Sequence, residues 1–99
     1  MGSLPIKSDL RVANGSQVNA IIADPRNPKN VYAAGPAGVF YSTDAGLTWT
    51  ARSNGLNSAV IVALTLNLMR PDTLFAMTTD NVLFRSDDGG KTWQGVPPS

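Results

Sequence analysis

The chain repeats itself once, and this repetition limits the folds that it can adopt more than any other feature of the sequence. A shift of 44 residues aligns Phe40–Trp49 with Phe84–Trp93, and six of the ten aligned positions are identical. A shift of 43 residues aligns the segments before them, so that Pro28 matches Pro71. A repeat of this length, built from short apolar segments, is typical of a propeller blade.

Each copy contains four short segments that we expect to form strands. Gly, Pro, Asn and Asp separate them at the spacing of an up-and-down antiparallel sheet. The expected strands are 18–23, 31–34, 38–42 and 48–52 in the first copy, and 60–66, 73–78, 82–86 and 92–96 in the second. No segment shows sustained helical spacing. The sequence therefore predicts an all-β fold of two four-stranded antiparallel propeller blades, which form part of an oligomeric β-propeller.

The repeat also predicts the division of the chain. We interpret residues 1–12 as a remnant of protein expression followed by a partial leading strand, residues 13–56 as the first blade and residues 57–99 as the second. The run Ala59–Leu64 is apolar at every position. We expect it to form an innermost strand that is sandwiched between neighbouring blades.

Missing residue types exclude several kinds of chemistry. The chain has no Cys, no His and no Glu, which excludes a zinc finger, a Ser-His-Asp triad, a thiol nucleophile and a disulfide framework. The formal net charge of +1 and the scattered arginines do not favour nucleic-acid binding. The longest mostly apolar stretch is too short to cross a bilayer. We expect no metal, no cofactor, no nucleic-acid partner and no membrane partner, and the sequence does not indicate a location.

The pattern Ser-x-Asp-x-Gly-x-Thr-Trp occurs in both copies and resembles the Asp-box, or BNR, repeat of sialidases, sortilin-like receptors, xyloglucan-cleaving glycosidases and photosystem assembly factors. Its residues are expected to be structural, with the carboxylate closing a hairpin, the Gly at positive φ and the Trp folded over the turn. They are Ser42, Asp44, Gly46, Thr48 and Trp49 in the first copy, and Ser86, Asp88, Gly90, Thr92 and Trp93 in the second.

The resemblance also implies where a ligand would bind. In that family the Asp-box hairpin lies on the face opposite the usual ligand mouth, which is lined by second-to-third strand loops and by loops between blades. Those loops correspond here to residues 35–38, 79–81 and 54–58. Their polar candidates are Asn54, Asn57, Asp80 and Asn81, although ordinary turn chemistry also explains each of them.

Two blades do not close a propeller ring, which takes about four to eight blades. The open apolar faces and sheet edges of a two-blade unit favour association. We therefore expect two to four identical chains to assemble, with three slightly favoured. The alternative is that the missing blades belong to the same, longer chain.

The sequence favours a non-catalytic interaction or scaffold module that presents loops to a protein or a glycan. One alternative is a small oligomeric lectin, for which Tyr32, Tyr41, Trp49 and Trp93 are the stacking candidates. Another is a fragment of an Asp-box glycoside hydrolase. The sialidase type implies an arginine triad with a Tyr and Glu pair, and this chain has no Glu. The xyloglucanase type can use paired aspartates, to which Asp80 or Asp9 could contribute.

Overall fold

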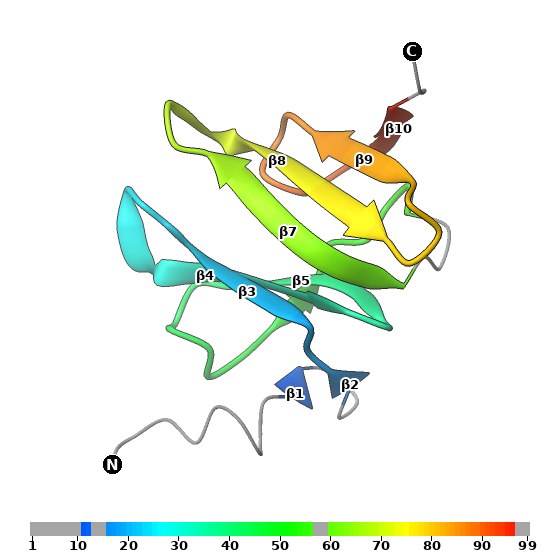
Figure 1. Ribbon diagram of the computed structural model, residues 1–99. Helices are drawn as coiled ribbons and strands as arrows, with labels where there is room; N and C mark the ends of the chain where they lie inside the picture. The colour runs from blue at the N-terminus through cyan, green and yellow to red at the C-terminus, as the bar shows by residue number, and fades with distance from the viewer. Residues whose placement is uncertain (1–10, 13–15, 57–59, 97–99) are drawn as a thin grey trace.

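The computed structural model describes residues 11–12, 16–56 and 60–96, which form two four-stranded antiparallel sheets and a short strand pair (Figure 1). Blade 1 consists of β3 (Ala20–Asp24), β4 (Asn27–Gly35), β5 (Gly38–Ser42) and β6 (Thr50–Ala51). Blade 2 consists of β7 (Ile61–Asn67), β8 (Arg70–Thr78), β9 (Leu83–Ser86) and β10 (Gln94–Val96). The strand pair is β1 (Arg11–Val12) and β2 (Ser16–Gln17).

This arrangement confirms the predicted all-β class and the two four-stranded antiparallel sheets, in which each strand pairs with the next along the chain. The strand β5 has the expected bounds, whereas β4 and β8 begin earlier because two-residue turns join them to β3 and β7. The outer strands β6 and β10 begin later than expected. Their preceding Thr48 and Thr92 amides donate to a carboxylate in the turn rather than to the sheet. The predicted blade boundary near residue 57 lies outside the described residues.

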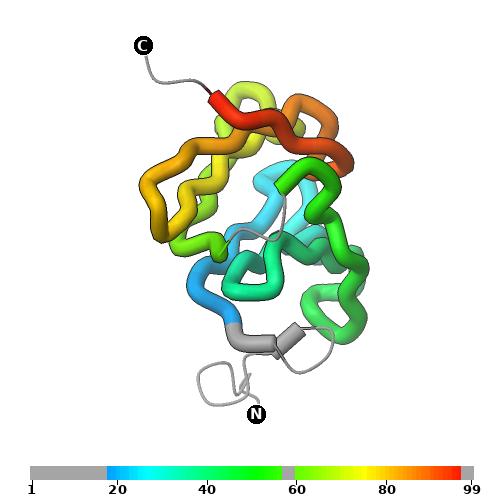
Figure 2. Tube along the Cα trace, turned by 90° about the vertical axis from the view of Figure 1, so that its right-hand side faces the viewer, coloured from blue at the N-terminus to red at the C-terminus, as the bar shows by residue number. Residues whose placement is uncertain are grey.

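The two blades pack face to face, with the innermost strands β3 and β7 next to each other (Figures 1 and 2). Alternate side chains of each sheet point into this interface. Blade 1 contributes Ala20, Ile22, Tyr32, Ala34, Val39 and Tyr41, and blade 2 contributes Ile61, Leu64, Leu66, Leu74, Ala76 and Phe84. Burying a large apolar side chain stabilises by about 1.5–3 kcal/mol, so this layer is the main contribution to the fold.

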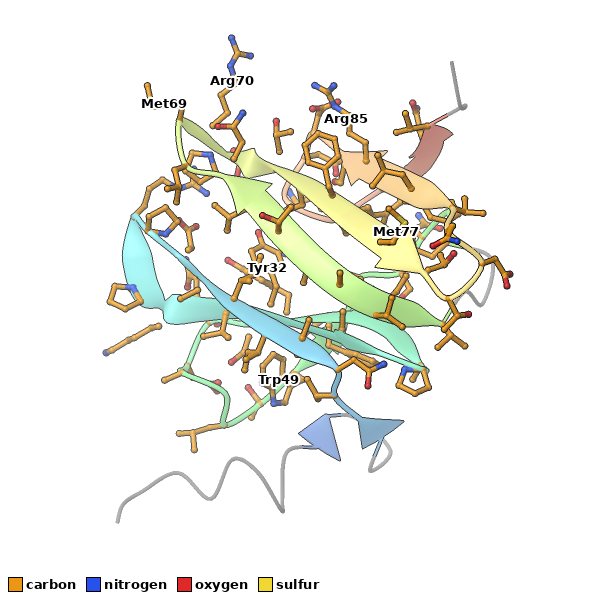
Figure 3. The ribbon with its side chains drawn as sticks, in the orientation of Figure 1. Tyr32, Trp49, Met69, Arg70, Met77 and Arg85 are labelled. Atoms are coloured by element: carbon orange, nitrogen blue, oxygen red, sulfur yellow. The ribbon has the colours of Figure 1, made fainter. Side chains whose placement is uncertain are left out.

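The opposite faces of the two blades differ from this interface because no further sheet of the described residues covers them. On blade 1, Val18 and Trp49 pack over the buried Ala33 and Phe40 and form a small second core (Figure 3). On blade 2, Val62 is 42% exposed although Ile61 beside it is buried. The sequence predicts a neighbouring blade on both faces of β7. Among the described residues, blade 1 covers one of these faces.

Candidate functional site

Both Asp-box turns are closed by one set of hydrogen bonds. The Asp44 carboxylate accepts from the Ser42 hydroxyl at 2.7 Å and from the Thr48 amide at 2.9 Å, and the Thr48 hydroxyl also donates to it. In blade 2 the Asp88 carboxylate accepts from the hydroxyl of Ser86 at 2.8 Å and from the amide of Thr92 at 2.9 Å. The carboxylates thus tie the end of the third strand to the start of the fourth.

These hydrogen bonds hold both carboxylates in the ionised form. The Thr48 hydroxyl, more than any other group, lowers the pKa of Asp44 to about 2. Hydrogen bonding by Thr92 likewise lowers the pKa of Asp88 to about 2. Because a general acid must carry a proton near neutral pH, neither turn carboxylate is suited to donate one.

The chain reverses through left-handed backbone in both turns. Gly46 and Gly90 have φ of 95° and 88°, a region that glycine enters without steric cost. The residues before them, Ala45 and Gly89, also have positive φ, at 63° and 73°. The Trp ring of each turn lies next to Gly46 or Gly90. A Cβ placed on Gly46 would be 3.4 Å from the Trp49 ring, and a Cβ placed on Gly90 would be 3.6 Å from the Trp93 ring.

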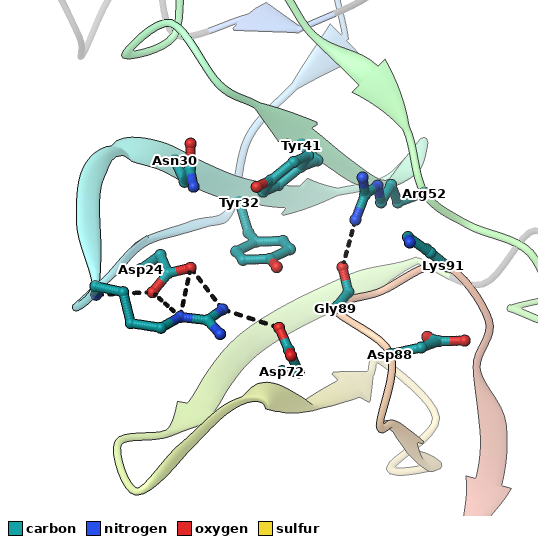
Figure 4. A pocket seen from close by; sticks show the side chains of 10 residues that line it. Asp24, Asn30, Tyr32, Tyr41, Arg52, Asp72, Asp88, Gly89 and Lys91 are labelled. Carbon is teal, nitrogen blue, oxygen red and sulfur yellow. Dashed lines mark hydrogen bonds and ion pairs between the residues drawn. The ribbon is translucent and has the colours of Figure 1, made fainter.

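A groove of about 410 Å³ lies between the two blades, at the end of the sheets where the Asp-box turns are found (Figure 4). Its lining combines aromatic, cationic and carboxylate side chains from both blades. Blade 1 contributes Asp24, Arg26, Asn30, Tyr32, Tyr41 and Arg52, and blade 2 contributes Asp72, Asp88, Gly89 and Lys91.

One ion network closes the first end of the groove. The Arg26 guanidinium pairs with the buried carboxylate of Asp24 at 2.8 Å and reaches across to Asp72 of blade 2, also at 2.8 Å. Hydrogen bonding by Arg26 lowers the pKa of Asp24, and the two carboxylates raise the pKa of Arg26. These three charges are therefore mutually satisfied and clamp the β3–β4 hairpin to blade 2.

Aromatic and cationic groups form the other end. The rings of Tyr32 and Tyr41 lie 4.7 Å apart, and the Arg52 guanidinium sits 4.0 Å over the Tyr41 ring. Arg52 also donates to the carbonyl oxygen of Gly89 at 2.8 Å. Burial raises the pKa of Tyr32 to about 12, so its hydroxyl stays protonated and can donate. The exposed Lys91 lies at the rim near Arg52 (Figure 4).

The ligand residues predicted from the sequence do not line this groove. Asn54 is exposed, and its carbonyl accepts from the Trp93 amide at 2.9 Å. Asp80 and Asn81 are exposed in the β8–β9 turn, at the opposite end of blade 2, where the Asp80 amide donates to the Thr78 hydroxyl. Asn57 lies outside the described residues. These four ligand residues stay a prediction.

Differences between the two copies are the signal that could have indicated the groove. Several lining residues have no like counterpart in the other copy: Asp24, Arg26, Tyr41 and Arg52 align with Asn67, Met69, Arg85 and Val96. The residues that the two copies share belong mainly to the structural turn. Positions at which the copies differ are free to take on a role that only one interface of the molecule has.

Two further kinds of site, for a metal ion and for a membrane span, concern the described part of the chain. There, no group of three or more His, Cys, Asp or Glu side chains could hold a metal ion. Within these same residues, no helix has the length and apolar character needed to span a membrane.

The fold and the turns define the class: two blades of a β-propeller, each with a carboxylate-closed hairpin between its third and fourth strands. The family model described as "BNR/Asp-box repeat" matches residues 40–51 and 84–94, the segments that contain the two turns. The chain therefore carries two BNR/Asp-box repeats, which confirms the resemblance seen in the sequence. A comparison with curated protein sequences gives no match.

Solved β-propeller structures are similar to this chain. An ancestral GH74 enzyme superimposes with a TM-score of 0.68 at 17% identity, covering 81% of this chain and 12% of that one. YCF48 from Cyanidioschyzon merolae gives 0.61 at 24% identity, covering 80% and 23%. A structure of YCF48 bound to D1 peptide gives 0.70 at 14% identity, covering 90% and 28%. The chain thus spans 28% or less of each of these three proteins, and the likeness shows the propeller fold alone.

Proposed function

We propose that this chain is a non-catalytic β-propeller module that binds a protein segment, and that further copies of the chain complete the propeller. The observation that carries the first part is the groove between the blades. It combines an aromatic wall at Tyr41, a buried hydroxyl at Tyr32 and two cations, Arg52 and Lys91, within one depression. Such groups recognise peptide carbonyls, acidic side chains and apolar side chains together.

The state of the carboxylates supports a role without catalysis. A glycoside hydrolase of the usual kind needs one carboxyl group with a raised pKa as acid and a second carboxylate at a fixed separation from it. In the groove, the pKa values of Asp24 and Asp88 are lowered, and both carboxylates are occupied by hydrogen bonds within the protein. Turnover of a chromogenic glycoside by the purified chain, lost in Asp80→Asn, would contradict the proposal.

One of the similar structures supports a peptide as the ligand class. It is described as YCF48 bound to D1 peptide, so a propeller of similar fold accepts a peptide. At 14% identity this similarity carries no residue of that site over to the present chain. In this chain, the groove between the blades is the site that we propose for a peptide.

A peptide array and a matched pair of variants test this function. We expect array peptides to bind, and Lys91→Ala to weaken the best of them by about fivefold or more, because an exposed cation at the rim is lost. Asp80→Ala, at the opposite end of blade 2, serves as the control and should leave binding unchanged. Loss of binding in Asp80→Ala alone would instead favour the loops predicted from the sequence. Binding to a glycan array with no peptide bound would replace the protein ligand with the lectin alternative.

Self-completion rests on the geometry of the two blades. Each blade is buried on one face and lacks a neighbouring sheet on the other within the described residues. Identical two-blade chains would give rings of four, six or eight blades, with two to four chains and three slightly favoured. Static light scattering measures the mass directly, and a mass of one chain at every concentration would refute self-completion.

A further inference from the structure

One face of blade 1 packs against blade 2, and the open face of blade 2 is formed by the residues that align with that face in the repeat. This outgoing face consists of Ala63, Thr65, Phe75, Met77, Leu83 and Arg85, which align with the six interface residues of blade 1 named above, in order. The face of blade 1 that points away from blade 2, the incoming face, consists of Val18, Ile21, Ala23, Val31, Ala33 and Phe40, and Val18 and Trp49 pack over Ala33 and Phe40. The six residues of the incoming face align in order with the six interface residues of blade 2.

Apolar side chains are exposed on the incoming face and beside the outgoing face. On the incoming face Ile21 is 41% exposed. Beside the outgoing face Val62 is 42% exposed, and Met69 in the β7–β8 turn is 88% exposed (Figure 3). Met69 is the counterpart of Arg26, the residue with which blade 1 reaches blade 2. Apolar groups at the positions that make the existing interface are typical of a surface that is covered by another blade.

The two Trp residues point to the same contact. The indole of Trp93 donates to the carbonyl oxygen of Arg52, on the preceding blade, at 2.8 Å. Trp49 is the counterpart of Trp93 in the repeat and is half-buried. The counterpart of Arg52 is Val96. A blade docked in the register of the existing interface would therefore bring the Trp49 indole to the carbonyl oxygen of Val96.

We propose that the occupant of the outgoing face is the incoming face of a second copy of this chain, docked head to tail in the register of blades 1 and 2. This inference rests on the proposed self-completion and adds the surfaces and the register. The contact uses two different faces of one molecule, so successive copies continue in one direction and close when the rotation completes a turn.

Three changes between the copies make the contact between chains weaker than the contact within the chain. Ile22 is replaced by Thr65 and Tyr41 by Arg85, so less apolar area meets the partner. The ion pair between Arg26 and Asp72 has Met69 and Lys29 as its counterparts, which form no ion pair. Assembly is therefore concentration-dependent, and each of the three changes offers a way to test the register.

The first test is a matched pair of substitutions measured by light scattering across a wide range of protein concentration. Thr65→Lys places a charge in the middle of the outgoing face, and Thr79→Lys places the same charge in the β8–β9 turn. Both threonines are exposed, so the fold of the single chain, checked by circular dichroism, should not change. We expect Thr65→Lys to raise the dissociation constant about tenfold or more, because the lysine must be desolvated, and Thr79→Lys to leave it unchanged. Thr65→Ile, which copies Ile22, should lower it.

The second test recreates the missing ion pair between chains. Chains with Met69→Arg and chains with Lys29→Asp are mixed, so that the counterparts of Arg26 and Asp72 meet only across the proposed interface. The mixture should associate about two- to fivefold more tightly than the average of the separate variants, the effect of an exposed ion pair. Without this gain the register is wrong.

The outcomes separate this inference from the proposed function. Assembly that Thr65→Lys weakens and Thr79→Lys does not supports the head-to-tail contact. Assembly that responds equally to both substitutions overturns the contact and leaves self-completion intact. A single-chain mass throughout overturns both, while the peptide-binding test of the groove is read independently.

Discussion

The two Asp-box turns have the same hydrogen bonds and different surroundings. In blade 2 the carbonyl oxygen of Gly89 accepts from Arg52 of blade 1, and the ring of Tyr32 lies beside Gly90. In blade 1 the corresponding turn has no such neighbour among the described residues, and its Leu47 is 83% exposed. The hydrogen bonds that close the turn therefore depend only on nearby residues, whereas the burial of the turn depends on the preceding blade.

This difference separates two roles of the Asp-box hairpin: it closes a turn within its own blade, and it contacts the preceding blade. Short-range hydrogen bonds give each hairpin its shape without help from the rest of the fold. The hairpin then serves as a contact surface for the blade before it, which is how the second turn closes the groove. Substituting equivalent residues in the two turns measures the second role separately from the first.

The largest difference is expected at the two Trp residues. Trp93 is 3% exposed and belongs to the main core, whereas Trp49 is half-buried in the smaller one. We expect Trp93→Ala to lower the free energy of unfolding by about 4 kcal/mol and Trp49→Ala by about 2 kcal/mol. Urea unfolding followed by circular dichroism measures both. Equal losses would mean that the blade interface adds nothing to the second turn. If copies dock as inferred, the loss for Trp49→Ala should grow with protein concentration.

The turn carboxylates come next. Each accepts hydrogen bonds from a Ser hydroxyl, a Thr hydroxyl and a Thr amide. Asp88→Ala should cost about 3 kcal/mol and Asp44→Ala clearly less, because only the second turn also holds the blades together. The exposed Asp80 in the β8–β9 turn is the control, and Asp80→Ala should change the free energy of unfolding by less than about 0.5 kcal/mol. A larger loss for Asp44→Ala than for Asp88→Ala would contradict this account.

A smaller effect is expected for the arginine that joins the second turn to blade 1. Arg52→Met removes its hydrogen bond to Gly89 and its contact with the Tyr41 ring, at a cost of about 1–2 kcal/mol. Arg85→Met is the matched control on the outgoing face, where the guanidinium is 50% exposed and pairs with Asp87. It should cost less than about 0.5 kcal/mol in the unassembled chain. Chemical denaturation of both variants checks the ranking.

Acid should produce the smallest and most gradual effect. The pKa values of Asp44 and Asp88 are lowered to about 2 in the folded chain, so the unfolded chain binds protons more readily at these groups. Their contribution to stability is fully present above about pH 4 and is lost as the pH falls from there to about 2. Urea midpoints measured across this range should fall. They should fall less steeply in Asp88→Asn, and an unchanged slope would contradict the assignment.

Part of the fold was predictable because its causes are local. The Ser-x-Asp-x-Gly-x-Thr-Trp pattern contains the hydroxyls, carboxylate and glycine that close the turn, so it predicts the hairpin after β5 without reference to other segments. Short apolar segments between turn residues likewise predict the strands. The ends of β6 and β10 were less predictable, because the Thr amides could pair either with a strand or with the Asp carboxylate.

The candidate site was not predictable in the same way. The carboxylate of Asp24 and that of Asp72 are brought together by Arg26 only because two sheets pack face to face. The loops predicted as a ligand mouth came from the family resemblance, and two of them, 35–38 and 79–81, lie at the end of the sheets opposite to this groove. Which of the two ends binds a ligand is the question that Lys91→Ala and Asp80→Ala address.

By itself, the sequence determined the repeat, the class of fold and the two carboxylate-closed hairpins, because each depends on residues that are close along the chain. Only the tertiary structure decided which face of each blade is buried, where the groove lies and which carbonyl oxygen accepts the hydrogen bond of the Trp93 indole. The physical reason is that the two copies have nearly equal local preferences. Their different surroundings arise from position, since blade 2 has blade 1 before it and blade 1 has no described blade before it.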